Sequence, residues 1–287
     1  MLQPGVVKIA DEQDFETLRT LMDDHTNWRL EYDKKANSDN NNTTTSSSSC
    51  CVNMRIWTKP TKACSFRMVK VHAFFPHVRP STVFDVLHDP GYRKMWDEHM
   101  IESVDIGYLD PTNDVSYYAL SCPPFIKNRD FVLQRSWSNK KDEKLILNHS
   151  VNHKDYDFRK GYVRATSYIT GYVIRRMKDG CFIGYISQSD PGGKVPPWLV
   201  NRIAHIVAPK IVENVRKAVD GYPEWKKAQP DATFKPWLHP EQALLSPQVS
   251  IRDCHADADA PPHHAEDDAH RKHSRPHLPP DIYARSR

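Results

Sequence analysis

The amino-acid sequence predicts an α+β fold in which a curved antiparallel sheet is closed by one long helix. Three observations lead to this prediction. Residues 105–189 contain one strand-like segment after another, rich in Val, Ile, Tyr, Phe and Thr. The linkers between them, such as 138–143 and 178–180, are short and polar, which is typical of antiparallel hairpins. One amphipathic helix pattern follows at 198–219, and its apolar side has to cover a face of that sheet.

The first part of the chain begins with a short helix. The pattern over 11–25 predicts it, because Asp11 can cap it and apolar residues recur at helical spacing. A strand is predicted at 28–32. Residues 36–49 are almost all Asn, Thr and Ser and offer nothing to bury, so we predict a disordered insertion there. We place this insertion inside a single domain that spans residues 1–242.

Two short helices are predicted between the first strands and the main run of strands. Strands at 54–59 and 65–75 come first. Ser81 is then the predicted cap of one helix, which Pro90 ends, and residues 91–100 form the next. The strands predicted after these helices are 115–122, 130–137, 144–151, 162–177 and 181–189.

The long helix at 198–219 has two unusual features. Its apolar band is wider than one packed face requires. Pro209 lies inside it and should leave the carbonyl of His205 without a helical hydrogen bond, which kinks the helix. Beyond Gln242 the chain is rich in Pro, His, Asp and Arg, so we predict a disordered tail at 243–287.

Composition argues against several classes of protein. A net charge of +4 over 287 residues is too small for a nucleic-acid binder. No N-terminal signal peptide and no run of about 18 apolar residues is present. The six cysteines show neither disulfide density nor zinc spacing, and the His-rich tail matches no defined metal site. We expect a cytoplasmic monomer without cofactor or metal.

Several strings go beyond fold class. Residues 84–89 (FDVLHD) and 92–97 (YRKMWD), the triplet 128–130 (NRD), and 190–201 (DPGGKVPPWLVN) appear in order. A more discriminating set lies near the end of the domain, with YPEW at 222–225 and KPWLHPEQ at 235–242. Together these strings resemble the START (StAR-related lipid-transfer) domain family, in its phosphatidylcholine-transfer subgroup.

The resemblance implies a helix-grip fold, in which the sheet wraps a hydrophobic tunnel and the last helix forms its lid. It also implies a protein that binds one glycerophospholipid, phosphatidylcholine and also phosphatidylethanolamine, and carries it between membranes through transient contact with their surfaces. Elementary energetics agrees with an enclosed site. Two acyl chains hold about 30 methylenes, and exposing them at ~0.8 kcal/mol each would cost on the order of 25 kcal/mol.

The resemblance also indicates which residues hold the lipid phosphate. Arg93 matches the phosphate-facing arginine of the subgroup, and Asp97, four residues on, would orient it and offset its burial. His99 stands where a phosphate-contacting tyrosine is expected. Taken from spacing alone, Arg93 and Asp97 are instead an ordinary surface ion pair of about 0.3–0.5 kcal/mol.

An ammonium group prefers the faces of aromatic rings. The resemblance places Tyr118, Phe131 and Tyr168 where the subgroup builds its choline cage, with Tyr118 replacing Trp and Phe131 replacing Tyr. These replacements weaken the attraction for a cation, so we expect an ethanolamine head to be accepted as well. The alternative is that the three rings only fill the core, as most aromatics in strands do.

The long helix is the predicted lid. Its broad apolar band predicts that part of it contacts a membrane when the tunnel opens, and Pro209 offers a hinge. The alternative for Pro209 is that it only bends the helix around a curved sheet. The residues predicted for the lid and for membrane docking are Trp198, Leu199, Ile206, Pro209 and Val212.

Two other functions remain open from the sequence. An enzyme that used the same tunnel would need a base or nucleophile inside it, yet the sequence contains no Gly-rich phosphate loop and no G-x-S-x-G motif. A lipid-sensing adaptor would bind lipid and signal through a partner without delivering it. Transfer of labelled lipid between liposomes separates such an adaptor from a carrier.

Overall fold

The computed structural model describes residues 2–34, 53–195 and 197–254, and for 197–207 it describes only the backbone. The predicted insertion at 36–49 and residues 255–287 lie outside this part. The helices are α1 (Glu12–Asp23), α2 (Pro80–His88), α3 (Pro90–Trp96), α4 (Pro197–Lys227), α5 (Pro240–Ala243) and the 3₁₀ turn η1 (Ile251–Cys254). The strands are β1 (Arg29–Lys34), β2 (Asn53–Lys59), β3 (Met68–Pro76), β4 (Met100–Asp110), β5 (Asn113–Leu120), β6 (Asn128–Asn139), β7 (Glu143–Ser150), β8 (Tyr162–Arg164), β9 (Thr166–Met177) and β10 (Gly180–Asp190).

Within the described residues one ten-stranded sheet carries the fold. Its strand order is β1-β2-β3-β10-β9-β7-β6-β5-β4, and the short β8 pairs beside β6. All neighbours along this path are antiparallel, as short hairpin linkers require. Only β6 and β8 run in parallel. The predicted α+β helix-grip fold, with a large antiparallel sheet and a long late helix, is confirmed.

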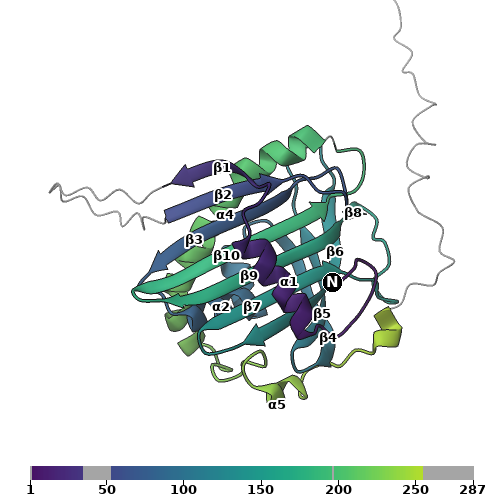
Figure 1. Ribbon diagram of the computed structural model, residues 1–287. Helices are drawn as coiled ribbons and strands as arrows, with labels where there is room; N and C mark the ends of the chain where they lie inside the picture. Colours follow the sequence, from purple (N-terminus) through teal and green to yellow (C-terminus); the bar gives the residue numbers. More distant parts are fainter. Residues whose placement is uncertain (1, 35–52, 196, 255–287) are drawn as a thin grey trace, which may run out of the picture. The chain divides into compact units, whose positions relative to one another are not determined.

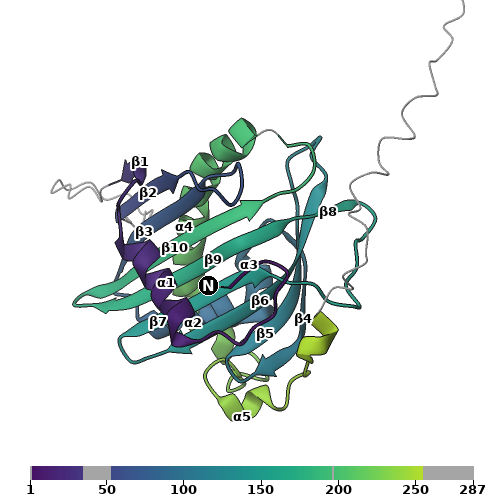
Figure 2. The same ribbon diagram turned by 45° about the vertical axis from the view of Figure 1, so that its right-hand side comes forward.

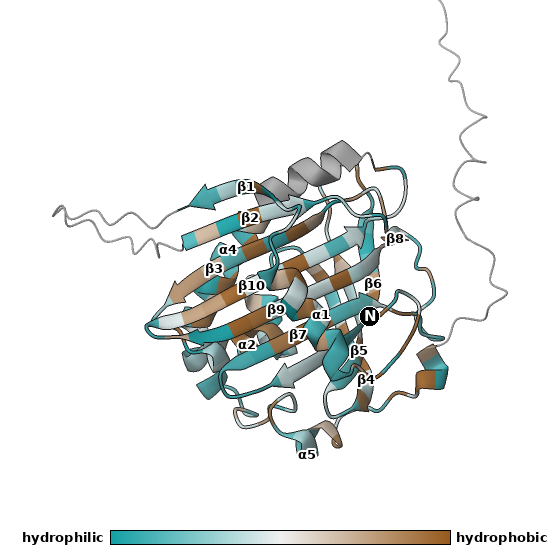
Figure 3. Ribbon diagram, in the orientation of Figure 1, coloured by the Kyte–Doolittle hydropathy of each residue, from teal (hydrophilic) through white to brown (hydrophobic). Residues whose placement is uncertain are grey.

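The helices divide between the two faces of the sheet. Figures 1 and 2 show α1 lying across β10, β9 and β7 on one face, which we call the outer face. The helices α2, α3 and α4 lie on the opposite, inner face. Figure 3 shows apolar residues along the middle of β3, β10, β9 and β7, where helices cover both faces. Strands that are covered on both faces read as nearly continuous apolar runs.

On the outer face α1 approaches the sheet very closely. Leu18 and Met22 of α1 are fully buried there. A β-carbon added at Gly171 would lie 2.5 Å from Cδ1 of Leu18, and one added at Gly184 would lie 2.4 Å from the sulfur of Met22. Two glycines on neighbouring strands therefore leave the space that the helix occupies. The helix starts at the predicted cap, Asp11, whose carboxylate accepts from the backbone N–H of Asp14 in a capping box.

Polar contacts add to this packing at the C-terminal end and along the side of α1. The Lys70 ammonium, buried under the end of the helix, donates to the carbonyls of Met22 at 3.2 Å and Asp24 at 2.7 Å. It thereby satisfies carbonyls that a helix end leaves open. On the side of the helix, Arg19 and Arg175 each contact one oxygen of the Glu143 carboxylate of β7, at 2.7 and 2.8 Å.

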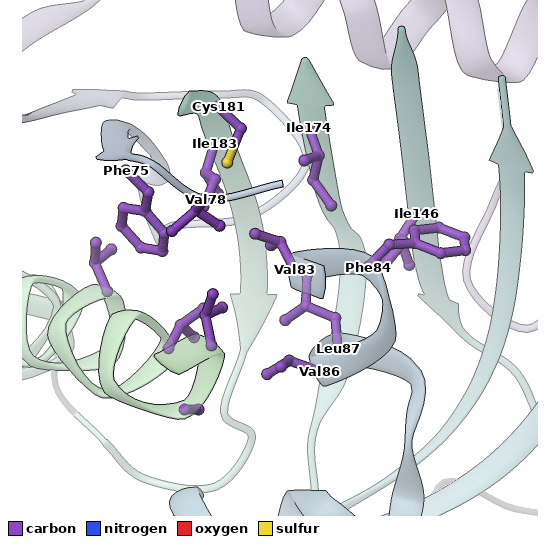
Figure 4. Packing of buried hydrophobic residues seen from close by; sticks show 14 of the residues in the cluster. Phe75, Val78, Val83, Phe84, Val86, Leu87, Ile146, Ile174, Cys181 and Ile183 are labelled. Atoms are coloured by element: carbon purple, nitrogen blue, oxygen red, sulfur yellow. The ribbon is translucent and has the colours of Figure 1, made fainter. Parts of the chain in front are cut away.

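On the inner face the helices pack mainly through apolar side chains. Figure 4 shows Phe75, Cys181 and Ile183 of the sheet beside α4, with Val83 and Leu87 of α2 nearby. All five belong to one buried cluster. This cluster is the core on which the inner helices rest.

The second half of α4 is also held by polar contacts. Tyr92 of α3 donates to the carbonyl of Ala218 at 2.8 Å. Asp89, the N-cap of α3, accepts from the hydroxyl of Tyr222 at 3.1 Å and pairs with Lys226 at 3.2 Å. Both oxygens of that carboxylate are therefore in use, since one caps α3 and the other holds α4.

Some elements differ from their predictions. The helix α2 starts at Pro80 after Arg79, with no side-chain cap, so Ser81 does not cap it. Proline suits the first turn of a helix because its missing N–H is not needed there. The predicted helix at 91–100 ends at Trp96, and the predicted strand at 162–177 is interrupted at Ala165.

The packed part of the chain also continues past the predicted boundary at Gln242. Tyr108 of β4 donates its backbone N–H to the carbonyl of Pro247 at 2.8 Å and accepts from the N–H of Val249 at 3.0 Å. Cys254 is fully buried in an outer-face cluster. Residues 243–254 are thus ordered by a few well-placed apolar side chains and by pairing with a sheet edge, although their overall composition is polar.

Candidate functional site

Arg93 of α3 is held so that part of its guanidinium remains available. Its Nε donates to Oδ2 of Asp97 at 3.1 Å. The guanidinium carbon lies 5.0 Å from the ring centre of Tyr118 and 5.4 Å from that of Trp96. Tyr118 also interacts with the guanidinium, and 32 % of the Arg93 side chain is exposed. Arg93 is therefore fixed in orientation while its terminal amino groups can still bind an anion.

Asp97 connects this arginine to the sheet. The same Oδ2 atom that accepts from Arg93 also accepts from the hydroxyl of Tyr118 on β5, at 2.8 Å. Asp97 thus orients two side chains at once, one from a helix and one from a strand. The predicted i,i+4 pair of Arg93 and Asp97 is present. The additional hydrogen bond from Tyr118 gives it a fixed geometry that a simple surface pair lacks.

The pKa shifts describe a partly desolvated site. Burial alone would lower the pKa of Arg93, but the nearby Tyr118 and Asp97 outweigh it and the pKa is raised. Burial raises the pKa of Tyr118, and the charge of Arg93 opposes this only in part. Arg93 therefore stays positive and the phenol of Tyr118 stays protonated at any physiological pH.

Sequence reasoning missed two tyrosines of this region. Tyr172 of β9 and Tyr185 of β10 lie directly opposite each other, with ring centres 5.0 Å apart. Burial raises the pKa of both phenols, and the positive charge of Arg93 offsets this only in part. Both residues share a face with Ile174 and Ile183 of the same strands, as the period-2 alternation requires. The alternation alone could have placed both tyrosines on the inner face. Their position opposite each other could not be predicted without the register between β9 and β10.

These tyrosines belong to a cavity between the sheet and α4. Its volume is about 20 Å³, which is room for about one water molecule. Phe75, Tyr172, Ile183 and Tyr185 line it from the sheet, and Ala208, Ile211, Val212 and Val215 line it from α4. Apart from the two phenol groups, these side chains are hydrocarbon. The wall therefore suits an apolar ligand, for which the space between the sheet and α4 has to widen.

The predicted ammonium cage is brought together only in part. Phe131 of β6 is the direct cross-strand partner of Tyr118, so the two rings share the inner face. Tyr168 lines a separate small pocket beside α1, with Leu2 and Thr17, on the outer face. Tyr168 is the extra residue of a β-bulge, because Ile169 pairs with Gln188 and Ser167 with Ser189. A bulge resets the alternation of side chains, which sequence patterns do not reveal.

The remaining predicted residues occupy various positions. His99 is exposed in the turn before β4, where its carbonyl accepts from the backbone N–H of Ser121 at 2.8 Å. Pro209 is half-buried within α4, and Val212 lies in the cavity wall. The side chains of Trp198, Leu199 and Ile206 are outside the described part. None of the helices that the structure describes is long and apolar enough to cross a bilayer.

Comparison with known proteins gives consistent matches. A family model described as "START domain" matches residues 8–224. The chain is 38 % identical to START domain-containing protein 10 of Mus musculus over 258 residues, or 88 % of this chain and 82 % of that protein. It is 26 % identical to phosphatidylcholine transfer protein of Mus musculus over 160 residues, or 53 % of this chain and 73 % of that protein.

Solved structures support the same grouping. The crystal structure of human STARD10 matches with a TM-score of 0.77 at 35 % identity, covering 89 % of this chain and 98 % of that one. Human StAR-related lipid transfer protein 5 matches with a TM-score of 0.63 at 17 % identity, covering 74 % of this chain and 95 % of that one. The second match shows the shared fold alone.

Proposed function

Because the chain belongs to the START domain family, we propose that it binds one glycerophospholipid between the sheet and α4 and transfers it between membranes. The proposed ligands are phosphatidylcholine and phosphatidylethanolamine. The relatives that support this are a phosphatidylcholine transfer protein and StAR-related lipid-transfer proteins. The proposal describes a carrier, with no covalent step assigned to any residue.

The observation that carries the proposal is the state of Arg93. A phosphate diester offers two non-bridging oxygens, and an arginine whose Nε is already fixed can donate to both of them from its two terminal amino groups. Asp97 and the rings of Tyr118 and Trp96 supply that fixation. The cavity wall of Ile183, Val212 and their neighbours then takes the hydrocarbon.

The small size of the cavity supports a movement of α4 when lipid binds. A cavity of about 150 Å³ takes one benzene molecule. The cavity of about 20 Å³ beside α4 is far smaller, so two acyl chains fit only if α4 moves away from the sheet. We propose that α4 shifts outward as the lid during uptake, at the surface of a membrane that the otherwise cytoplasmic monomer contacts only for the exchange. Trp198, Leu199 and Ile206 remain our proposed membrane contacts.

For the lipid ammonium we retain Tyr118 and Phe131, which share the inner face next to Arg93. One face of the Tyr118 ring is already engaged by the Arg93 guanidinium, which leaves a weaker cage for a quaternary ammonium. An ethanolamine head can instead donate hydrogen bonds to nearby carbonyls and hydroxyls. This supports acceptance of both head groups. Tyr168 would join them only if its strand rearranged.

Replacement of Arg93 by Ala tests the proposal. Two charge-assisted hydrogen bonds would be lost, so we expect phospholipid binding to weaken by about a hundredfold or more. The fold should persist, because this arginine lies at the edge of the core. Native mass spectrometry of the purified protein and transfer of labelled lipid between liposomes give the two readouts.

Arg176→Ala is the matched control, since Arg176 forms an exposed pair with Asp142 at 3.2 Å, away from the cavity. It should bind and transfer lipid normally. Normal lipid binding by Arg93→Ala would refute the phosphate role. Lipid binding without transfer by the unmodified protein would favour an adaptor over a carrier.

A further inference from the structure

Tyr172 lies between the proposed phosphate site and the apolar cavity. Its ring forms part of the cavity wall together with Phe75 and Ile183. The charges of Arg93 and Asp97 also act on the pKa of its phenol. Tyr185 of β10 lines the same cavity and its pKa is likewise affected by Arg93. Tyr172 and Tyr185 therefore lie at the boundary between charged groups and hydrocarbon.

The hydroxyl of Tyr172 differs from those of its neighbours. Tyr118 donates to Asp97, Tyr92 to the carbonyl of Ala218, and Tyr222 to Asp89. The hydroxyl of Tyr185 interacts with that of Ser187. Within the described residues, Tyr172 Oη has no hydrogen-bond partner. A half-buried hydroxyl in an apolar wall costs free energy unless water or a ligand supplies the partner, so this hydroxyl is available to a ligand.

The protonation state of this phenol determines what it can bind. Burial raises the pKa of Tyr172, and the positive charge of Arg93 offsets this only in part. The phenol therefore keeps its proton and can donate it. The group that complements it is an acceptor without a proton, such as a carbonyl oxygen.

The order of these elements matches the order of groups in a diacyl glycerophospholipid. Such a lipid has a phosphate, then a glycerol with two ester carbonyls, then two hydrocarbon chains. The protein presents Arg93, then Tyr172, then the wall of Ile183 and Val215. We propose that Tyr172 Oη donates a hydrogen bond to a glycerol ester carbonyl, so that the site prefers ester-linked over ether-linked phospholipids. This inference rests on the proposed lipid-carrier function.

The competing explanation is that Tyr172 only packs. Its ring contacts that of Tyr185 across the strand pair, and cross-strand aromatic pairs stabilise sheets without any ligand. A packing role needs the ring and not the hydroxyl. Tyr172→Phe keeps the ring and removes the hydroxyl, so it separates the two explanations.

The test uses vesicles that contain equal amounts of a diacyl phosphatidylcholine and its dialkyl ether analogue. The full chain is incubated with them and re-isolated, and native mass spectrometry gives the ratio of the two bound lipids. One hydrogen bond predicts a roughly threefold to tenfold preference for the diacyl lipid in the unmodified protein. Tyr172→Phe should reduce this ratio to about one while still binding lipid.

Tyr162→Phe is the control, because it removes a hydroxyl from β8 in the outer-face cluster around Val132, away from the cavity. It should keep the preference for the diacyl lipid. Equal binding of both lipids by the unmodified protein would overturn the inference, and so would an unchanged preference in Tyr172→Phe. If the unmodified protein took up neither lipid, the carrier function itself would fail, which is a separate result.

Discussion

The two helices that cover the sheet are held in different ways. On the outer face α1 fits into the space left by Gly171 and Gly184, and Lys70 and Glu143 bind its end and its side. On the inner face the middle of α4 meets the sheet mainly through hydrocarbon and the cavity beside Tyr172, with one exposed ion pair between Glu213 and Lys34 of β1. Its buried polar contacts lie in its second half, around Asp89.

This difference indicates which side of the molecule opens. Hydrogen bonds and ion pairs have fixed geometry and break abruptly, whereas apolar contacts can be exchanged for contacts with a ligand of the same chemistry. A lipid chain can therefore replace the apolar contacts of α4 without leaving polar groups unpaired. The same displacement of α1 would break the hydrogen bonds from the buried Lys70 ammonium to the carbonyls of Met22 and Asp24. We therefore propose that the outer helix is a fixed part of the scaffold and that the inner helix is the part that moves.

The strongest test of this comparison is to tether each helix. Lys34 of β1 and Glu213 of α4 form an exposed pair at 3.0 Å, so cysteines at these two positions can be joined by a cross-linker with two thiol-reactive groups. This tether should stop lipid transfer while preloaded lipid stays bound. Cysteines in place of Arg19 and Glu143, joined in the same way, link α1 to β7 and should leave transfer unchanged. Normal transfer with the α4 tether closed would show that α4 is not the lid.

The second test removes the polar anchor of α4. In Asp89→Ala the Lys226 ammonium, of which 7 % is exposed, loses its nearest carboxylate, and α3 loses its cap. Removing one partner of a buried ion pair costs about 3–5 kcal/mol. Urea unfolding should show a loss of this size. Asp142→Ala, in an exposed pair with Arg176, is the control and should change stability little. A similar small change in Asp89→Ala would mean that α4 is held by packing alone.

The third test uses pH to probe the outer anchor. Burial lowers the pKa of Lys70 from 10.5 to about 8. Between these two values the unfolded chain binds more protons than the folded chain, so the penalty for burying the ammonium falls as pH rises. Relative to Lys70→Met, the stability of the unmodified protein should improve by about 2 kcal/mol between roughly pH 7 and 9.5. Unfolding of both proteins at each pH measures the difference, and a constant difference would contradict it.

The smallest effect is expected for an exposed contact of α1. Arg175 binds both oxygens of Asp23, at 2.7 and 2.8 Å, yet 53 % of the Asp23 side chain is exposed. Asp23→Asn should therefore cost only about 0.2–1 kcal/mol, and less in 1 M salt. Urea unfolding at both salt concentrations measures this. A larger, salt-independent loss would show that this pair, rather than packing, positions the helix.

Much of the fold was predictable because it depends on local patterns. Asp11 marks the start of α1, and the runs of Val, Ile and Tyr mark the strands. The resemblance to the START family is confirmed by the matched residues 8–224. Around Arg93, the spacing to Asp97 predicted a contact that the structure contains at 3.1 Å.

The unpredicted parts of the site depend on pairing between distant segments. The bulge at Tyr168 exists only because β9 and β10 slip by one residue there, and that slip moves the ring to the outer face. Tyr172 and Tyr185 meet because of the register of the same two strands, which no window of sequence contains. The role of Tyr118 as a partner of Asp97 likewise needed the position of α3 against β5.

The short pairing of 247–249 with Tyr108 has a consequence for how copies of the chain meet. β4 is the last strand of the sheet, and without residues 243–254 its backbone groups at Tyr108 would face water. The cluster around Tyr117 and Val132 would lose Val249 and Cys254. An uncovered edge beside an apolar surface is a template on which a second copy can add a strand. A chain shortened at Gln242 should therefore self-associate and aggregate, because these twelve residues cap the open end of the sheet.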